Sequence, residues 1–168
     1  MKIKLIGVCL LGFLFFNCNT DNEPSCAEDF TGALTATETV LEGTWALTAI
    51  ESSVAIDLTD DQEDNAIKDI YSQSTDCQND AVYSFLSSRS FSLKQGYVAE
   101  DCEQKSSITG SWQLSGDILS LVNSCTVFNV EIEVNEEETA FTVSNVLNLR
   151  DIDNKIVQAN VTYTYTKS

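Results

Sequence analysis

The sequence predicts an all-β domain built from eight antiparallel strands, and three observations support this prediction. Apolar and polar residues alternate without error over residues 128–134 and again over 157–165, as in strands with one buried and one wet face. Short polar or glycine-containing segments separate such stretches and are typical of hairpin turns. Hydrophobic residues make up 43% and aromatic residues 9% of the 168 residues, so the chain can bury one core.

The expected strands follow one another along the chain as consecutive hairpins. They cover residues 45–49, 83–85, 91–93, 112–114, 118–122, 128–134, 141–147 and 157–165. Residues 87–89 (SSR) are expected to turn between the second and third strands. Residues 115–117 (SGD) are expected to form a tight turn before the fifth strand, because glycine can take a positive φ. The polar segments 135–138 and 151–155 suit the last two hairpin loops.

One short helix is predicted between the first and second strands. The residues TDDQ at 59–62 match a capping box, acidic residues fill the first turn, and apolar residues recur at helical spacing from Ala66 to Tyr71. The acidic stretch 57–64 lacks the internal glycine and the terminal glutamate of a calcium loop. We therefore expect a solvated helix start here and no metal site.

Charge and composition exclude several classes of function. A net charge of −17 argues against binding to nucleic acid, because that binding needs clustered lysine and arginine. The chain has no histidine, which removes Ser-His-Asp and Cys-His catalytic sites and imidazole zinc sites. The densest carboxylate cluster, residues 136–138, is expected to be a solvated turn. We expect neither an enzyme nor a bound cofactor.

The N-terminus has the pattern of an export signal. Lys2 and Lys4 precede an apolar stretch at 5–16, which is shorter than the roughly 20 residues of a membrane span. The residues FFNC that end at Cys18 resemble the lipobox of bacterial lipoproteins, in the relaxed form of the Bacteroidota. This resemblance implies cleavage after residue 17 and acylation of Cys18, with chains such as palmitate anchoring the protein in the outer membrane. The alternative is a secreted protein that is cut nearby.

The resemblance divides the chain into three parts. Residues 1–17 are the expected signal peptide, 18–40 a lipid-anchored linker, and 41–168 the folded domain. The acidic residues 19–23 resemble signals that send some lipoproteins of the same phylum to the cell surface. A solvated acidic linker predicts the same residues, so the periplasmic and the surface face of the membrane both stay open.

Cysteine spacing predicts two disulfides. Without Cys9 in the apolar stretch and the acylated Cys18, four cysteines remain, namely Cys26, Cys77, Cys102 and Cys125. An even number in an oxidising compartment favours disulfides. Cys77 and Cys102 flank the predicted hairpin at 81–95, which would bring them together, so Cys26 pairs with Cys125 by exclusion. A redox or metal-binding thiolate pair is disfavoured, because no C-x-x-C spacing is present.

Two short motifs carry a resemblance to a known family. Residues 43–45 (GTW) resemble the G-x-W signature of lipocalins, and GSW at 110–112 repeats it. The chain also has a long helical connection and the two cysteines, Cys77 and Cys102, that flank the predicted hairpin at 81–95. Together with the two motifs, these features resemble the lipocalin-like domains of small Bacteroidota lipoproteins over about residues 40–167. The resemblance implies an eight-stranded antiparallel up-and-down barrel. We find no pattern for the terminal helix that packs on such barrels.

The resemblance also implies a function. A barrel of eight strands either fills with side chains or holds one small ligand. We therefore expect a monomeric, membrane-anchored protein that binds a small hydrophobic molecule. Eight inward aromatic residues are the candidate ligand contacts, namely Trp45, Tyr83, Phe85, Phe91, Trp112, Phe128, Phe141 and Tyr163. The alternatives are that these residues only pack the core, and that a filled barrel serves as an envelope scaffold for a protein partner.

Overall fold

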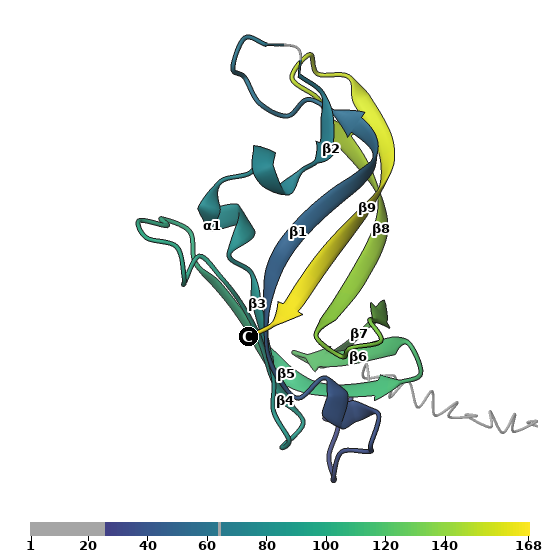
Figure 1. Ribbon diagram of the computed structural model, residues 1–168. Helices are drawn as coiled ribbons and strands as arrows, with labels where there is room; N and C mark the ends of the chain where they lie inside the picture. The colour runs from purple at the N-terminus through teal and green to yellow at the C-terminus, as the bar shows by residue number, and fades with distance from the viewer. Residues whose placement is uncertain (1–25, 64) are drawn as a thin grey trace, which may run out of the picture.

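The computed structural model describes residues 26–63 and 65–168. It contains one antiparallel sheet of nine strands, eight of which close into an up-and-down barrel (Figure 1). The predicted fold class is therefore confirmed. The expected signal peptide and Cys18 lie outside the described residues, within which no helix has the length and apolar character to cross a membrane.

The elements follow the predicted order, with one additional strand and three short helical turns. Their bounds are η1 Glu38–Val40, β1 Gly43–Ile56, β2 Ile67–Asp69, η2 Tyr71–Gln73, α1 Asp76–Asn79, β3 Val82–Phe85, β4 Ser90–Gln95, β5 Ser106–Ser115, β6 Ile118–Asn123, β7 Thr126–Val134, β8 Ala140–Arg150 and β9 Ile156–Lys167. The loops after β7 and β8 coincide with the predicted polar segments.

The long strand β1 closes the barrel. One of its edges pairs with β3 near Gly43 and with the additional strand β2 near Ile56. Its other edge pairs with the last strand, β9, from Trp45 opposite Lys167 to Ser52 opposite Val161. The barrel therefore consists of β1 and β3 to β9, and β2 extends the sheet beyond the start of β3.

The predicted helix lies in the wrong place. A short helix does occur between the first two barrel strands, but it is α1, where Thr75 and Gln78 form the capping box. Within the predicted helix, residues Ile67–Asp69 form β2 instead. The carboxylate of Asp57 accepts a hydrogen bond from the backbone N–H of Thr59 at 3.1 Å. Such local bonds from aspartate to the backbone favour turns over helix, which explains the error.

One end of the barrel is filled by aromatic side chains. Trp45 and Trp112 are fully buried, and each indole N–H donates to a backbone carbonyl, that of Leu41 at 2.8 Å and that of Leu86 at 3.1 Å. Lys167 lies over the Trp45 ring, 5.1 Å from its centroid. We call this end, which η1 covers, the closed end of the barrel. Its two tryptophans come from the two G-x-W motifs.

A buried ion pair joins the closed end to the chain that precedes β1. Arg89 and Glu38 are 5% and 1% exposed, and the guanidinium donates to both carboxylate oxygens, at 2.6 and 2.9 Å. Arg89 also donates to the carbonyls of Gly32 and Ala33. The Glu38 carboxylate accepts from the backbone N–H of Thr35. Because both ions have partners on several sides, the cost of burying them is offset.

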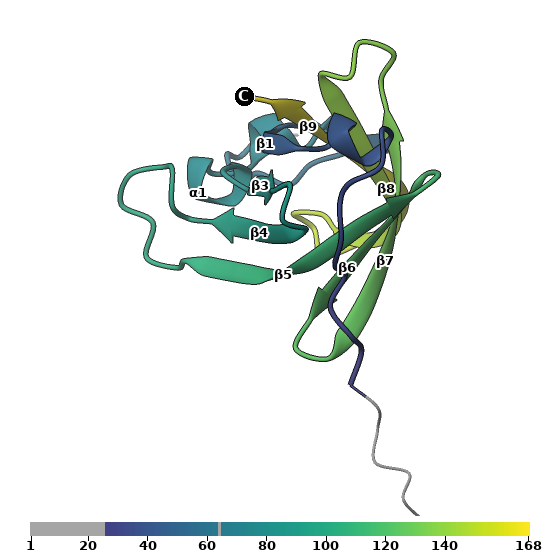
Figure 2. The same cartoon turned by 90° about the horizontal axis from the view of Figure 1, so that it is seen from below.

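Both predicted disulfides are present. Cys77 is bonded to Cys102 and Cys26 to Cys125. The second bond attaches the start of the described chain to the turn between β6 and β7. From there the segment runs across the outer face of β5 and β6 (Figure 2), where the backbone N–H of Phe30 donates to the Ser111 hydroxyl at 2.9 Å. Residues 26–40, part of the expected linker, therefore contact the barrel along their length.

The buried ion pair predicts how stability depends on pH. The hydrogen bonds from Arg89 lower the pKa of Glu38 from its ordinary 4.5 to about 2. A lowered pKa in the folded state contributes stability above pH 4.5, and this contribution is lost as the pH falls toward 2. We expect Glu38→Gln to lower the free energy of unfolding by about 3 kcal/mol at pH 7 and by much less at pH 2.

The measurement is urea unfolding at both pH values, followed by tryptophan fluorescence. The exposed Glu42, changed to glutamine, is the control and should unfold like the wild type at pH 7. An equal loss of stability for Glu38→Gln at pH 7 and pH 2 would contradict the prediction.

Candidate ligand-binding site

The barrel wall opens between β7 and β8. These strands pair at only three positions, from Ile132 opposite Val143 to Val134 opposite Phe141. In contrast, β7 pairs with β6 from Thr126 to Glu131, and β8 pairs with β9 along its whole length. Figure 1 shows β8 following β9 while β6 and β7 run across the barrel. From Glu131 back to Thr126, at the start of β7, the strand has no pairing with β8. The wall has a gap there.

A cavity of about 460 Å³ lies in this gap. Its walls combine three tyrosines with two valines, and polar residues of β7 and β8 line the remainder. The aromatic and aliphatic lining is Tyr83, Tyr163, Tyr165, Val130 and Val143, and the polar lining is Asn129, Glu131, Ser144 and Asn145. We call this the tyrosine-lined cavity.

Strand alternation directs the tyrosines inward. On β9, Tyr163 and Tyr165 alternate with threonines, and the register places them opposite Val143 and Phe141 of β8. The rings of Tyr83 and Tyr165 meet edge to face, with centroids 5.1 Å apart and planes at 71°. Phe141 stacks on Tyr165 with centroids 5.0 Å apart. The buried core therefore supports the aromatic wall of the cavity.

The three phenols are neutral hydrogen-bonding groups. Burial raises the pKa of Tyr83, Tyr163 and Tyr165, and proximity to the other two raises that of Tyr165 further. Within the described part of the chain, no protein group makes a hydrogen bond to any of the three hydroxyls. Tyr165 is only 9% exposed. Its hydroxyl has no protein partner among the described residues and borders the cavity, where solvent can reach it.

The charge around the cavity is negative. Glu131 is the one charged residue in the lining, and it also borders an adjoining hollow of about 350 Å³ that contains Asp117 and Glu133. Among residues 26–63 and 65–168, neither lysine nor arginine lines either space. The same residues contain no group of three side chains placed to hold a metal ion.

The structure separates the eight predicted ligand contacts into three groups. Five are core residues with at most 4% exposure, namely Trp45, Phe85, Phe91, Trp112 and Phe141. Tyr83 and Tyr163 line the cavity. Phe128 lies on the part of β7 that β8 no longer covers, and it is 53% exposed. Tyr165 was missing from the prediction, although it shares the inward face of β9 with Tyr163.

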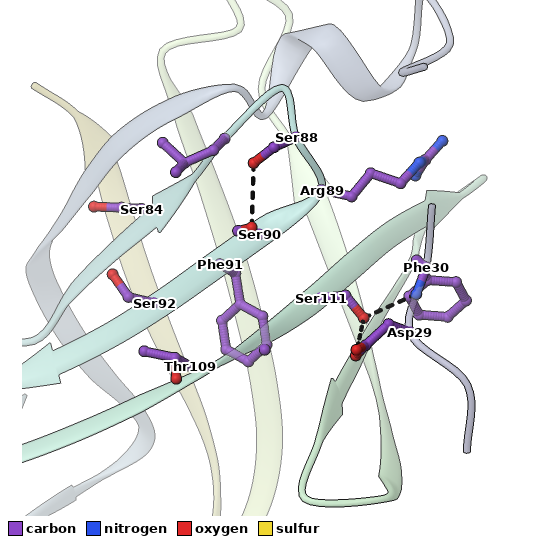
Figure 3. Close-up of a pocket in the computed structure, with 12 residues that line it drawn as sticks. Asp29, Phe30, Ser84, Ser88, Arg89, Ser90, Phe91, Ser92, Thr109 and Ser111 are labelled. Atoms are coloured by element: carbon purple, nitrogen blue, oxygen red, sulfur yellow. Dashed lines mark hydrogen bonds between the residues drawn. The ribbon is translucent and has the colours of Figure 1, made fainter. Parts of the chain in front are cut away.

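A second hollow, of about 620 Å³, lies on the outside of the barrel. Small hydroxyl side chains line it, among them Ser84, Ser92 and Thr109, which stand opposite one another on β3, β4 and β5 (Figure 3). At one end, the Ser111 hydroxyl donates to the Asp29 carboxylate at 2.9 Å. Phe30 and Phe91 also line this hollow, but it lies on the outer face of the sheet. The tyrosine-lined cavity reaches the inward face of β9, and we therefore take it as the candidate site.

Because some of the predicted aromatic residues are buried and others exposed, replacing them by alanine should lower stability by different amounts. Phe141 is fully buried against Trp45 and Tyr165, so Phe141→Ala should lower the free energy of unfolding by about 3–5 kcal/mol. Phe128 is half exposed, so Phe128→Ala should cost less than about 1 kcal/mol. Urea unfolding at pH 7 measures both. Similar losses for the two variants would mean that Phe128 is buried in solution.

The comparison with known families covers both the barrel and the segment that the Cys26–Cys125 disulfide attaches to it. Residues 19–168 match the model of a family described as a domain of unknown function, DUF5004. No curated protein matches the chain. The match includes all nine strands and every residue of the tyrosine-lined cavity. Because it extends over nearly the whole chain, the protein belongs to the DUF5004 family.

Proposed function

We propose that the protein is a membrane-anchored binding protein that holds a small hydrophobic molecule in the tyrosine-lined cavity. The observation that carries the proposal is the cavity itself. Its volume of about 460 Å³ lies within the range of about 300–1,000 Å³ that is usual for ligand pockets. Its lining has the usual composition too, because aromatic and aliphatic walls are combined with a few polar groups.

The two ends of the barrel suit different tasks. The closed end is packed with buried aromatic side chains and gives the cavity a firm floor. The gap between β7 and β8 gives a ligand a path from solvent to the tyrosines. A filled barrel that serves only as a scaffold would account for the packing at the closed end, but it would leave the cavity without a role.

Binding can be tested with N-phenyl-1-naphthylamine, an uncharged fluorescent probe that brightens in apolar surroundings. Val143 lines the cavity, whereas Val146, on the same strand, is 68% exposed. We expect the wild type to bind the probe, Val143→Trp to bind it at least about 10-fold more weakly because the larger side chain fills the space, and Val146→Trp to bind like the wild type.

Thermal unfolding of the three proteins controls for loss of the fold. If the wild type binds neither this probe nor any copurifying apolar molecule that organic extraction can detect, the proposed ligand-binding function is wrong. If the Val143→Trp variant bound the probe as tightly as the wild type does, the binding site would lie elsewhere.

Membrane anchoring is the second part of the proposal and rests on the lipobox-like residues that end at Cys18. Expressed in a bacterium of the phylum Bacteroidota, the wild type should incorporate an alkyne-tagged palmitate and sediment with membranes. Cys18→Ala should lose the label and enter the soluble fraction, because no acyl chain is left to insert in the bilayer. Labelling that persists in the Cys18→Ala variant would contradict the assignment, and Cys9→Ala is the matched control.

A further inference from the structure

We propose that the ligand of the tyrosine-lined cavity is an organic cation, that is, an apolar molecule bearing an alkylated ammonium group. This inference rests on the proposed ligand-binding function and goes further, because it names the charge of the ligand. Three features of the cavity support it, namely its aromatic walls, the charge at its rim and the unpartnered hydroxyl of Tyr165.

The aromatic walls come from two strands, β3 and β9, whose tyrosine rings border one space. Tyr83 and Tyr165 stand nearly at right angles, with centroids 5.1 Å apart. Tyr163 lies two residues before Tyr165 on the same face of β9 and lines the same cavity. The face of an aromatic ring carries negative electrostatic potential, and quaternary ammonium groups bind in sites that several such rings enclose.

The rim of the cavity selects for positive charge. Glu131 lies in the lining, and Asp117 and Glu133 border the adjoining hollow. Two cations lie at the closed end, where Arg89 pairs with Glu38 and Lys167 lies over the Trp45 ring. With a net charge of −17 on the whole chain, an anionic ligand such as a fatty-acid carboxylate would meet repulsion at every stage of its approach.

The interior of the cavity suits the rest of such a molecule. Val130 and Val143 supply apolar surface for its hydrocarbon part. Tyr165 is 9% exposed and its hydroxyl has no protein partner within the described residues, so it is free to bond to a polar atom of the ligand. Because solvent is partly excluded here, attraction between a cation and the rings is stronger than at an open surface.

A matched pair of ligands tests the inference. Benzyltrimethylammonium and neopentylbenzene have the same shape and differ by one positive charge. We expect the cation to displace N-phenyl-1-naphthylamine from the wild type at a concentration about 10-fold lower than its uncharged isostere does in 20 mM salt. This preference should shrink in 500 mM salt, because carboxylates at the rim are screened. Benzylsulfonate, an anion of similar size, should displace the probe least.

Two variants locate the source of the preference. Glu131→Gln should lower the affinity for the cation several-fold and leave that for neopentylbenzene unchanged, because the two side chains have nearly the same shape. Tyr163→Leu should also reduce the preference, since it removes one ring face. Glu42→Gln removes an exposed carboxylate at the closed end and should behave like the wild type. Thermal unfolding checks that each variant is folded.

The outcomes separate this inference from the proposed function. If the cation and its isostere displace the probe equally, or if Glu131→Gln weakens both to the same extent, the ligand is not selected by charge and the inference is overturned, while the cavity remains a hydrophobic site. If N-phenyl-1-naphthylamine itself does not bind to the wild type, the proposed function fails first and the inference fails with it.

Discussion

The buried pair of Glu38 and Arg89 is the interaction on which the arrangement of the barrel depends. Residues that are 51 positions apart in sequence meet there, and the guanidinium also bonds to carbonyls of the segment before η1 and of β5. Removing either partner would leave a buried charge without compensation, which is far more costly than losing a surface ion pair. The pair therefore fixes the N-terminal segment, the β3–β4 turn and β5 in one arrangement.

A fixed closed end allows the opposite wall to stay open. The aromatic residues beneath the pair interlock, from Trp112 through Phe85 to Phe141, and Phe141 stacks on Tyr165. The aromatic wall of the cavity is thus an extension of the core. The packed core and the aromatic surface that borders the cavity belong to one cluster. The point at which β7 and β8 separate determines which residues of the cluster border the cavity.

Strand alternation is a local signal and was sufficient to predict the barrel strands. The hairpin between Cys77 and Cys102 predicted their disulfide, whereas the bond between Cys26 and Cys125, which are 99 positions apart, followed by exclusion. The helix was misplaced because its acidic residues bond to nearby backbone groups in turns. Alternation also identified the inward face of β7, but it cannot reveal that β8 leaves β7 after three residue pairs, so Phe128 was grouped with the buried aromatics. Glu38 could not be singled out among 26 acidic residues, since its partner is distant in sequence.

The Cys26–Cys125 bond determines how mechanical force enters the molecule. A pull on the chain ahead of Cys26 is transmitted through covalent sulfur to the β6–β7 turn, and it bypasses the hydrogen bonds that seat residues 27–42 against the barrel. The load then reaches the hairpin of β6 and β7, which consecutive backbone pairs hold together, before it reaches the ion pair and tryptophans of the closed end. Reduction of this single bond would redirect the same force onto the segment that leads to η1.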